Sequence, residues 1–230
     1  MRPADMFARH GLATSQSSRM ETIVQDHQLS GAAKADTLRL AAAGFVATAI
    51  AFGPARMGFG LFLPAFREDF ALSTTAAGLV ASGGFLAFLL ALPLTAWLAA
   101  QIGQRAPVVA GALSAAIGFA LVASASGSAA LAAGVALAGA SAGCCWAPFN
   151  DAAERVVPQD RRATALSVVS TGTSVGVVAA ALLAWGVSRE MLDWRGAWIG
   201  FAVGGVALAA VARAGLPPIR EPGQRPRRTG

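Results

Sequence analysis

Long apolar runs separated by short polar connections dominate this chain. The runs cover about residues 40–63, 74–100, 107–125, 129–150, 164–187 and 195–216. A helix that crosses a hydrocarbon core of about 30 Å needs about 20 mostly apolar residues, and each run supplies that length. The pattern predicts an all-α fold: a polytopic membrane bundle of six transmembrane helices, spanning 39–216.

The segments outside the bundle are polar. Residues 1–38 mix polar and charged side chains, which predicts a disordered cytoplasmic tail, and residues 217–230 form a basic cytoplasmic tail. The first apolar run is too long for the h-region of a secretory signal peptide. We therefore expect it to stay in the protein as a span.

Composition supports the membrane class. Hydrophobic residues make up 55% of the 230 residues and charged residues 13%, which is unusual for a soluble domain of this size. The net charge of +6 does not indicate nucleic-acid binding, because the basic residues lie in tails and connections and form no aromatic-interleaved face. A lipid bilayer is the expected partner.

The distribution of Lys and Arg predicts an orientation. With the N-terminus inside, 14 of the 18 basic residues fall on that side, and Arg67, Arg189 and Arg195 fall on the other. Positive charge is enriched in cytoplasmic segments. Both termini are therefore expected in the cytoplasm, in a multi-pass protein of the cell inner (plasma) membrane.

The remaining basic residue, Arg56, lies inside the first apolar run. An Arg at the centre of a spanning helix costs about 2.5–3.5 kcal/mol on insertion scales, so it usually faces a protein interior or a water-filled cavity. Arg56 is thus a candidate for a substrate pathway, as an anion-binding or proton-coupling group. The alternative is a structural Arg that bonds backbone carbonyls or extends toward the outer interface.

Several segments, taken together, carry a family signature. They are Gly58-Phe-Gly-Leu-Phe-Leu-Pro64 followed by Arg67-Glu-Asp69, Leu72-Ser73 before Ala76-Ala-Gly78, the glycine-rich 139–148 segment, Val156 to Leu166, and Asp193-Trp-Arg195 before Trp198. They resemble the N-terminal half of a major facilitator superfamily transporter. The resemblance implies secondary transport of a small-molecule solute by alternating access, in a fold of two six-helix halves.

The six predicted spans correspond to one such half. The resemblance therefore implies a second six-helix half or a homodimer as partner, or else a truncated form of a transporter. The alternative is a non-transporting membrane interaction or regulatory protein built on a six-helix half. The family's gate motif favours this alternative: Gly103 and Arg105 remain, but Thr95, Ala100, Gln101 and Gln104 replace its other positions.

The fourth and fifth spans carry further candidates. Trp146 and Asn150 share a helix face at i, i+4, with a kink expected at Pro148, and in the resembling family this span borders the central cavity. Alternatively, they are an interfacial Trp and part of a capping pair with Asp151. The hydroxyls of Ser167 to Ser174 are either pathway-lining groups or contacts within and between helices.

Small residues predict close helix packing at the pairs Gly139 and Gly143, Gly172 and Gly176, and Gly200 and Gly204. Other chemistry is not indicated. Both histidines lie in the first tail and Cys144-Cys145 lack metal-ligand spacing, so we expect neither metal nor cofactor. Gly139-Ala-Ser-Ala-Gly143 matches a nucleophile pattern, but it lies in a predicted helix without a histidine base, so no enzyme is expected. The chain shows no phosphate-binding loop either.

Overall fold

A computed structural model describes residues 31, 34–103, 105–144 and 146–215. Six helices in these ranges are long and apolar enough to cross a membrane: Lys34–Leu61, Thr74–Ile102, Arg105–Ala123, Ser128–Arg155, Gln159–Ser188 and Trp194–Arg213. The predicted all-α bundle of six spans is confirmed.

The spans contain shorter elements. The first span continues through the π-helical turn η1 (Gly53–Met57) into α2 (Gly58–Leu61), and α3 (Leu63–Phe70) follows. The remaining elements are α4 (Thr74–Ile102), α5 (Arg105–Ala123), α6 (Ser128–Gly143), α7 (Trp146–Val156), α8 (Gln159–Ser188) and α9 (Trp194–Gly215).

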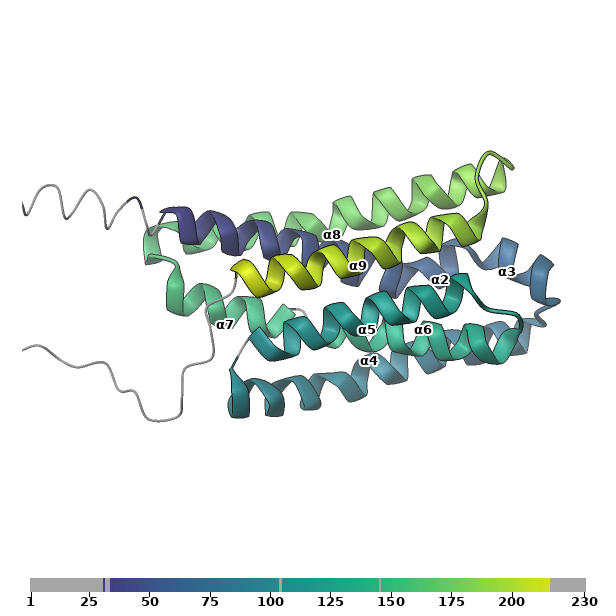
Figure 1. Ribbon diagram of the computed structural model, residues 1–230, viewed down its shortest axis with the longest axis horizontal. Coiled ribbons are helices and arrows are strands. Elements are labelled where there is room, and N and C mark those ends of the chain that lie inside the picture. The colour runs from purple at the N-terminus through teal and green to yellow at the C-terminus, as the bar shows by residue number, and fades with distance from the viewer. Residues whose placement is uncertain (1–30, 32–33, 104, 145, 216–230) are drawn as a thin grey trace, which may run out of the picture.

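The helices run along the long axis of the molecule (Figure 1). α5 packs against α6 and α9, α4 packs against α6, and the first span packs against α8. The start of the first span and the end of α9 lie at the same end, which we call the terminal end. The opposite end, with α3 and the α8–α9 connection, is called the distal end.

Two buried clusters fill the bundle. One groups Leu40, Phe149 and Leu208 with many alanines, and the other is rich in aromatic residues. In the second cluster Phe62, Phe66, Phe119, Trp194, Trp198 and Phe201 pack with ring centroids 5.1–6.4 Å apart. Edge-to-face and tilted ring pairs add stability beyond buried area. These rings join the end of the first span to α5 and α9.

Several helices extend beyond the predicted boundaries. The first span begins at Lys34, so residues 34–38 are helical and do not belong to a disordered tail. α8 begins at Gln159, five residues before the predicted start of its apolar run. Hydropathy marks only the segment in hydrocarbon, whereas backbone hydrogen bonding continues through polar residues that reach water. The rest of the predicted tails, 1–30 and 216–230, lies outside the described residues.

The fourth span is interrupted. α6 ends at Gly143 and α7 begins at Trp146, so the interruption precedes Pro148. Proline lacks an N–H, and its ring clashes with the carbonyl four residues earlier, which here belongs to Cys144. This explains why the interruption lies before Trp146 and not at Pro148, where the kink was expected.

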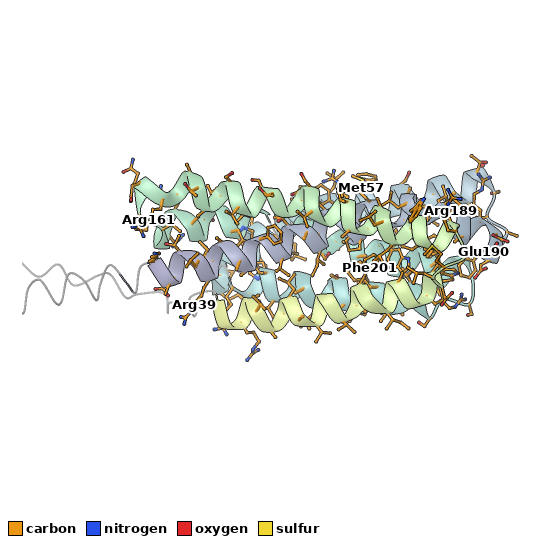
Figure 2. The ribbon with its side chains drawn as sticks, turned by 90° about the horizontal axis from the view of Figure 1, so that it is seen from above. Arg39, Met57, Arg161, Arg189, Glu190 and Phe201 are labelled. Atoms are coloured by element: carbon orange, nitrogen blue, oxygen red, sulfur yellow. The ribbon has the colours of Figure 1, made fainter. Side chains whose placement is uncertain are left out.

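Charged side chains gather at the two ends of the bundle. In Figure 2, Arg39 and Arg161 lie at the terminal end, and Arg189 and Glu190 lie at the distal end. Among the described residues, the terminal end carries seven Lys and Arg, against Arg67, Arg189 and Arg195 at the distal end. Arg56 belongs to neither group.

Candidate functional site

A cavity of about 410 Å³ lies between the first span, α4 and α6. Its lining is mostly small and apolar, with two arginines: Ala55, Arg56, Met57, Phe59, Gly60, Leu63, Arg67, Thr74, Ala77, Gly78, Ala81, Gly84, Phe85, Phe88, Val135 and Gly139. Pockets that bind small molecules typically measure about 300–1,000 Å³ and are mainly apolar with a few polar groups. The size and lining both suit a small ligand.

Arg56 reaches this cavity from the π-helical turn η1. The turn contains Pro54, and Gly58 N–H donates to the Pro54 carbonyl within it. π-helical turns are rare and occur frequently at functional sites. Met57, the neighbour of Arg56, lies between the two ends of the bundle in Figure 2.

Three phenylalanine rings surround the Arg56 guanidinium. Its central carbon lies 4.5 Å from the Phe88 ring centroid, 5.3 Å from Phe85 and 5.7 Å from Phe52. A cation above ring faces within about 6 Å is stabilised by the ring quadrupoles. The Arg56 Nε atom is nonetheless buried without a hydrogen-bond partner among the described residues. Its polar capacity is therefore only partly used within this bundle.

The cavity is electropositive. Arg67, near the distal end, donates from Nε to the Leu72 carbonyl at 3.3 Å and from Nη2 to Thr74 Oγ1 at 3.0 Å. Within the described part of the chain, the lining contains two arginines and no acidic residue. Elsewhere in the described residues, ion pairs join Arg39 to Asp36, Arg161 to Asp160 and Arg195 to Asp69. None of these pairs involves Arg56 or Arg67, so neither cavity arginine is paired with a carboxylate.

Glycines both open and close the cavity. A Cβ atom at Gly60 or Gly78 would meet nothing within 4 Å, so these positions border open space. A Cβ at Gly139 would collide with the Gly84 backbone, because α6 and α4 touch there. Small residues thus let two helices meet on one side of the cavity and leave it open on the other.

The other predicted pathway residues are placed differently. Asn150 is half-buried in α7, is engaged in a polar interaction, and is absent from the cavity lining. Trp146 begins α7, but its side chain lies outside the described part of the structure. A role for Trp146 and Asn150 in the pathway therefore stays a prediction, and of the three candidates the cavity includes Arg56.

The predicted packing glycines fall into two groups. A Cβ at Gly172 or Gly176 would collide with backbone of the first span, and one at Gly143 would lie 2.8 Å from the Phe88 carbonyl oxygen. In contrast, a Cβ at Gly200 would meet nothing within 4 Å. Sequence reasoning missed Gly205, whose Cβ would lie 2.9 Å from the Ala116 nitrogen, because no second glycine marks it at four-residue spacing.

A hydrogen bond beside these glycines was also missed. Thr48 of the first span is fully buried, and its hydroxyl lies 2.6 Å from the Val169 carbonyl oxygen of α8 and 3.0 Å from the Gly44 carbonyl oxygen of its own helix. A lone threonine in an apolar run has no sequence signal for such a role. Its position at the Gly172 crossing fixes the first span against α8.

The residues left from the gate motif make contacts inside the bundle. Gly103 ends α4 with a φ of 84°, a backbone conformation that favours glycine. Arg105 donates a hydrogen bond to the carbonyl of Arg213 at the end of α9. Thr95, at a replaced position, is buried with its hydroxyl 3.2 Å from Cys144 Sγ. These contacts connect α4, α5, α6 and α9 at the terminal end.

Three further hydroxyls bond carbonyls of their own helix. Ser170 and Thr171 face outward from α8 and donate to the carbonyls four residues earlier, at 2.9 Å each. Ser141, in the nucleophile-like pattern, is buried in α6 and donates to the Ala138 carbonyl at 2.6 Å. It lies on a continuous helix, not on the sharp strand-to-helix turn that the nucleophile pattern requires.

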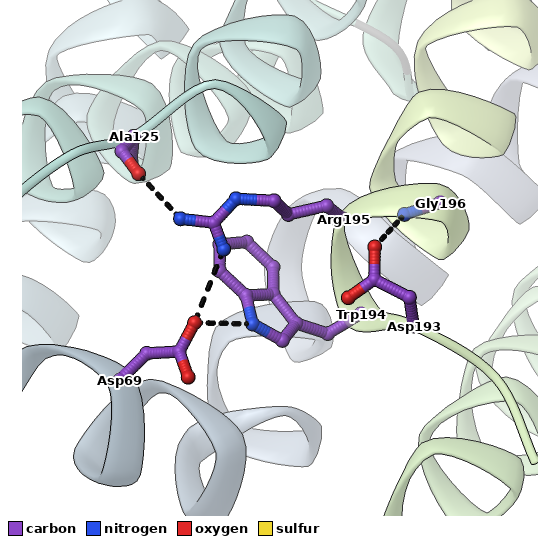
Figure 3. A network of polar contacts seen from close by, with 6 residues as sticks. All are labelled: Asp69, Ala125, Asp193, Trp194, Arg195 and Gly196. Carbon is purple, nitrogen blue, oxygen red and sulfur yellow. Dashed lines mark hydrogen bonds and ion pairs between the residues drawn. The ribbon is translucent and has the colours of Figure 1, made fainter. Parts of the chain in front are cut away.

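A polar network joins three segments at the distal end (Figure 3). Trp194 Nε1 and Arg195 Nη1 both donate to Asp69 Oδ2, at 2.8 and 3.1 Å, and Arg195 Nη2 donates to the Ala125 carbonyl at 2.9 Å. The Asp193 carboxylate accepts from the Gly196 N–H in the first turn of α9. The network links α3, the α5–α6 connection and α9.

Comparison with known proteins gives the family. The sequence profile described as "Major Facilitator Superfamily" matches residues 41–230. The chain belongs to the major facilitator superfamily. A search of curated protein sequences found no match.

A solved transporter structure shares the fold. The structure titled "Crystal structure of peptide transporter POT in complex with sulfate" superposes with a TM-score of 0.64 at 20% sequence identity. The match covers 78% of this chain and 37% of that chain. The matched part thus spans well under half the length of that transporter chain, and the likeness concerns the fold.

Proposed function

We propose that this superfamily member moves a small solute across the cell inner membrane by alternating access, and that solute binds in the Arg56 cavity. The observation that carries the proposal is a charge kept inside a membrane span, beside a cavity of about 410 Å³, with a buried nitrogen that has no partner among the described residues. A charge in a span costs free energy, so its retention favours a role with a ligand or a coupling ion.

The proposal includes a second helical body on the open side of the cavity, and the exposed apolar faces of α4 and α8 suit either such a body or lipid. α8 buries Val169, Gly172 and Gly176 against the first span and exposes Val175, Val178 and Leu182. In the proposed assembly, a second six-helix half or a second copy of the chain covers the face that borders the cavity. Alternating access then consists of rocking between the two bodies about the bound solute.

We also propose that the terminal end faces the cytoplasm. Of the basic residues described at the two ends, seven lie at the terminal end and three at the distal end. Cytoplasmic segments are enriched in Lys and Arg, which favours this orientation. Cysteine labelling from outside intact cells provides a check: Glu190→Cys should react with an impermeant reagent and Asp160→Cys should not.

The proposal is tested with the purified chain in proteoliposomes. Uptake of a panel of radiolabelled solutes is measured: a sugar, a zwitterionic amino acid, a dipeptide, an organic cation and an organic monoanion. We expect uptake of at least one solute above that of empty vesicles, and loss of this uptake in Arg56→Gln at equal protein content. Native mass spectrometry of the same preparation gives the number of copies per particle. A monomeric chain that moves none of the solutes would contradict the proposal.

A second candidate is a non-transporting interaction protein. It is favoured by the terminal end, where Thr95 and Arg105 hold α4, α5, α6 and α9 together within one bundle and no charged Asp is left in the gate motif. In this case a partner protein would bind the bundle, and the Arg56→Gln variant would bind the same partner as the wild type does. Co-purification of the wild-type chain and the variant from native membranes separates the two candidates.

A further inference from the structure

We infer that the Arg56 cavity selects a small organic monoanion that carries an apolar or aromatic portion. This inference rests on the proposed function, because it names the chemical class of the solute. The juxtaposition that points to it is a guanidinium with an unused donor, enclosed by aromatic rings, beside an otherwise apolar cavity.

The sign of the charge follows from the lining. Arg56 and Arg67 are its charged residues within the described part, and neither is paired with a carboxylate there. Arg67 already donates to a backbone carbonyl and a threonine hydroxyl, both neutral. A neutral or cationic solute would leave this positive charge uncompensated, whereas a carboxylate would accept charge-assisted hydrogen bonds from Arg56.

The apolar portion follows from the rest of the lining. Apart from the two arginines and Thr74, the cavity presents glycine, alanine, valine, leucine, methionine and phenylalanine side chains. An inorganic anion would lose much of its hydration to these walls without regaining hydrogen bonds. An organic acid places its carboxylate at Arg56 and its apolar part against α4 and α6.

The phenylalanines explain how the cation is kept ready. Phe52, Phe85 and Phe88 hold the guanidinium carbon within 5.7 Å of their ring centroids, and these cation–π contacts leave its Nε–H without an acceptor among the described residues. A carboxylate at the pocket edge of the guanidinium would add to these contacts without displacing them. An Asp or Glu of the protein beside the guanidinium would pair with it and take the place of such a ligand. The described residues that line the cavity include no Asp or Glu.

Binding to the purified chain in lipid nanodiscs tests the inference. The probes are two carboxylates, benzoate and hexanoate, with the matched neutral amides benzamide and hexanamide, and inorganic sulfate. Competition against radiolabelled benzoate is measured in wild type, Arg56→Gln and Arg56→Lys. We expect each carboxylate to bind at least about tenfold tighter than its amide, and Arg56→Gln to remove most of that preference. Arg56→Lys keeps the charge and should retain part of it.

The wild-type comparison decides the inference even if Arg56→Gln fails to fold. Carboxylates that bind no tighter than their amides would overturn it. Sulfate that binds as tightly as benzoate would overturn the requirement for an apolar portion. Uptake of a sugar or a zwitterion in the proteoliposome panel, with no carboxylate preference, would overturn the anion class and leave the proposed transport function standing.

Discussion

The two halves of the first span use one helix in opposite ways. Toward the terminal end, the first span packs closely against α8 at Thr48, Gly172 and Gly176, a contact that we call the seam. The Thr48 hydroxyl is buried there and lies within 3.1 Å of three carbonyl oxygens. Eight residues later, Arg56 borders a cavity with its Nε unpartnered among the described residues. The polar group of one half is hydrogen-bonded inside the bundle, and that of the other half has a donor without an acceptor.

The difference teaches how a membrane bundle can tolerate a charge. A Cβ atom at Gly53 would collide with the Gly176 backbone and one at Gly176 with the Ala49 backbone, and the π-helical turn begins at this crossing. Because the seam fixes the helix one turn before Arg56, the charged side chain is held between aromatic rings. We expect changes in the seam to affect folding, and changes at the cavity to affect binding with little effect on folding.

The seam is broken most severely by a large side chain at Gly176. A Cβ there would already collide with the backbone at Ala49, and a backbone contact cannot be relieved by turning a side chain. Overpacking a core with extra methylene groups typically costs about 1–3 kcal/mol, and because Gly176→Leu also drives a Cβ into backbone, its cost should exceed that range. We expect little or no folded protein when detergent extracts are examined by size-exclusion chromatography.

Gly200→Leu is the matched control for that variant. Gly200 belongs to a pair with the same four-residue spacing, but it is exposed and its Cβ would meet nothing within 4 Å. This variant should elute as wild type does. Equal yields of Gly176→Leu and Gly200→Leu would show that the seam does not fix the first span.

The cavity half is tested by filling it. Gly78 lines the cavity and borders open space, so Gly78→Phe should occupy the volume without a backbone collision. We expect benzoate binding to fall by at least about tenfold, or about 1.4 kcal/mol. The thermal midpoint of unfolding should stay close to that of wild type, unlike that of a seam variant.

Gly83→Phe provides the control on the same helix. Gly83 also has nothing within 4 Å of a Cβ atom, but it is absent from the cavity lining. Its binding of benzoate should equal that of wild type. If both phenylalanine variants weaken binding equally, the ligand does not occupy this cavity.

The two halves also differ in how far the sequence could predict them. The six spans could be predicted from the length of the apolar runs, because each segment that crosses lipid must itself be apolar. Arg56 was identified for the same reason. Its neighbours Phe85 and Phe88 were not, since they come from α4 and only tertiary packing brings them to Arg56.

Glycine pairs show the same limit. Gly172 and Gly176 approach the first span, whereas Gly200 is open, although the four-residue spacing is identical. Spacing places two small residues on one helix face but cannot say what that face packs against. The interruption before Trp146 likewise follows from Pro148, but its position depends on the carbonyl four residues earlier, at Cys144.

The smallest expected effect comes from the hydroxyl of Thr48. Thr48→Val keeps the shape of the side chain and removes the hydrogen bond to the Val169 carbonyl. Interhelical hydrogen bonds in membrane bundles contribute about 0.6 kcal/mol on average and at most about 1.7 kcal/mol, because the unfolded state in the membrane finds other partners. We expect Thr48→Val to lower the free energy of unfolding by an amount in this range, measured by titration with sodium dodecyl sulfate in mixed micelles. Thr48→Ser, which keeps the hydroxyl, should lose less stability.

Because Thr48 lies in the seam, removing its hydroxyl should leave the affinity for benzoate unchanged. A fall in affinity with unchanged stability would mean that the seam positions Arg56 directly, and that the two halves of the span are coupled and not independent.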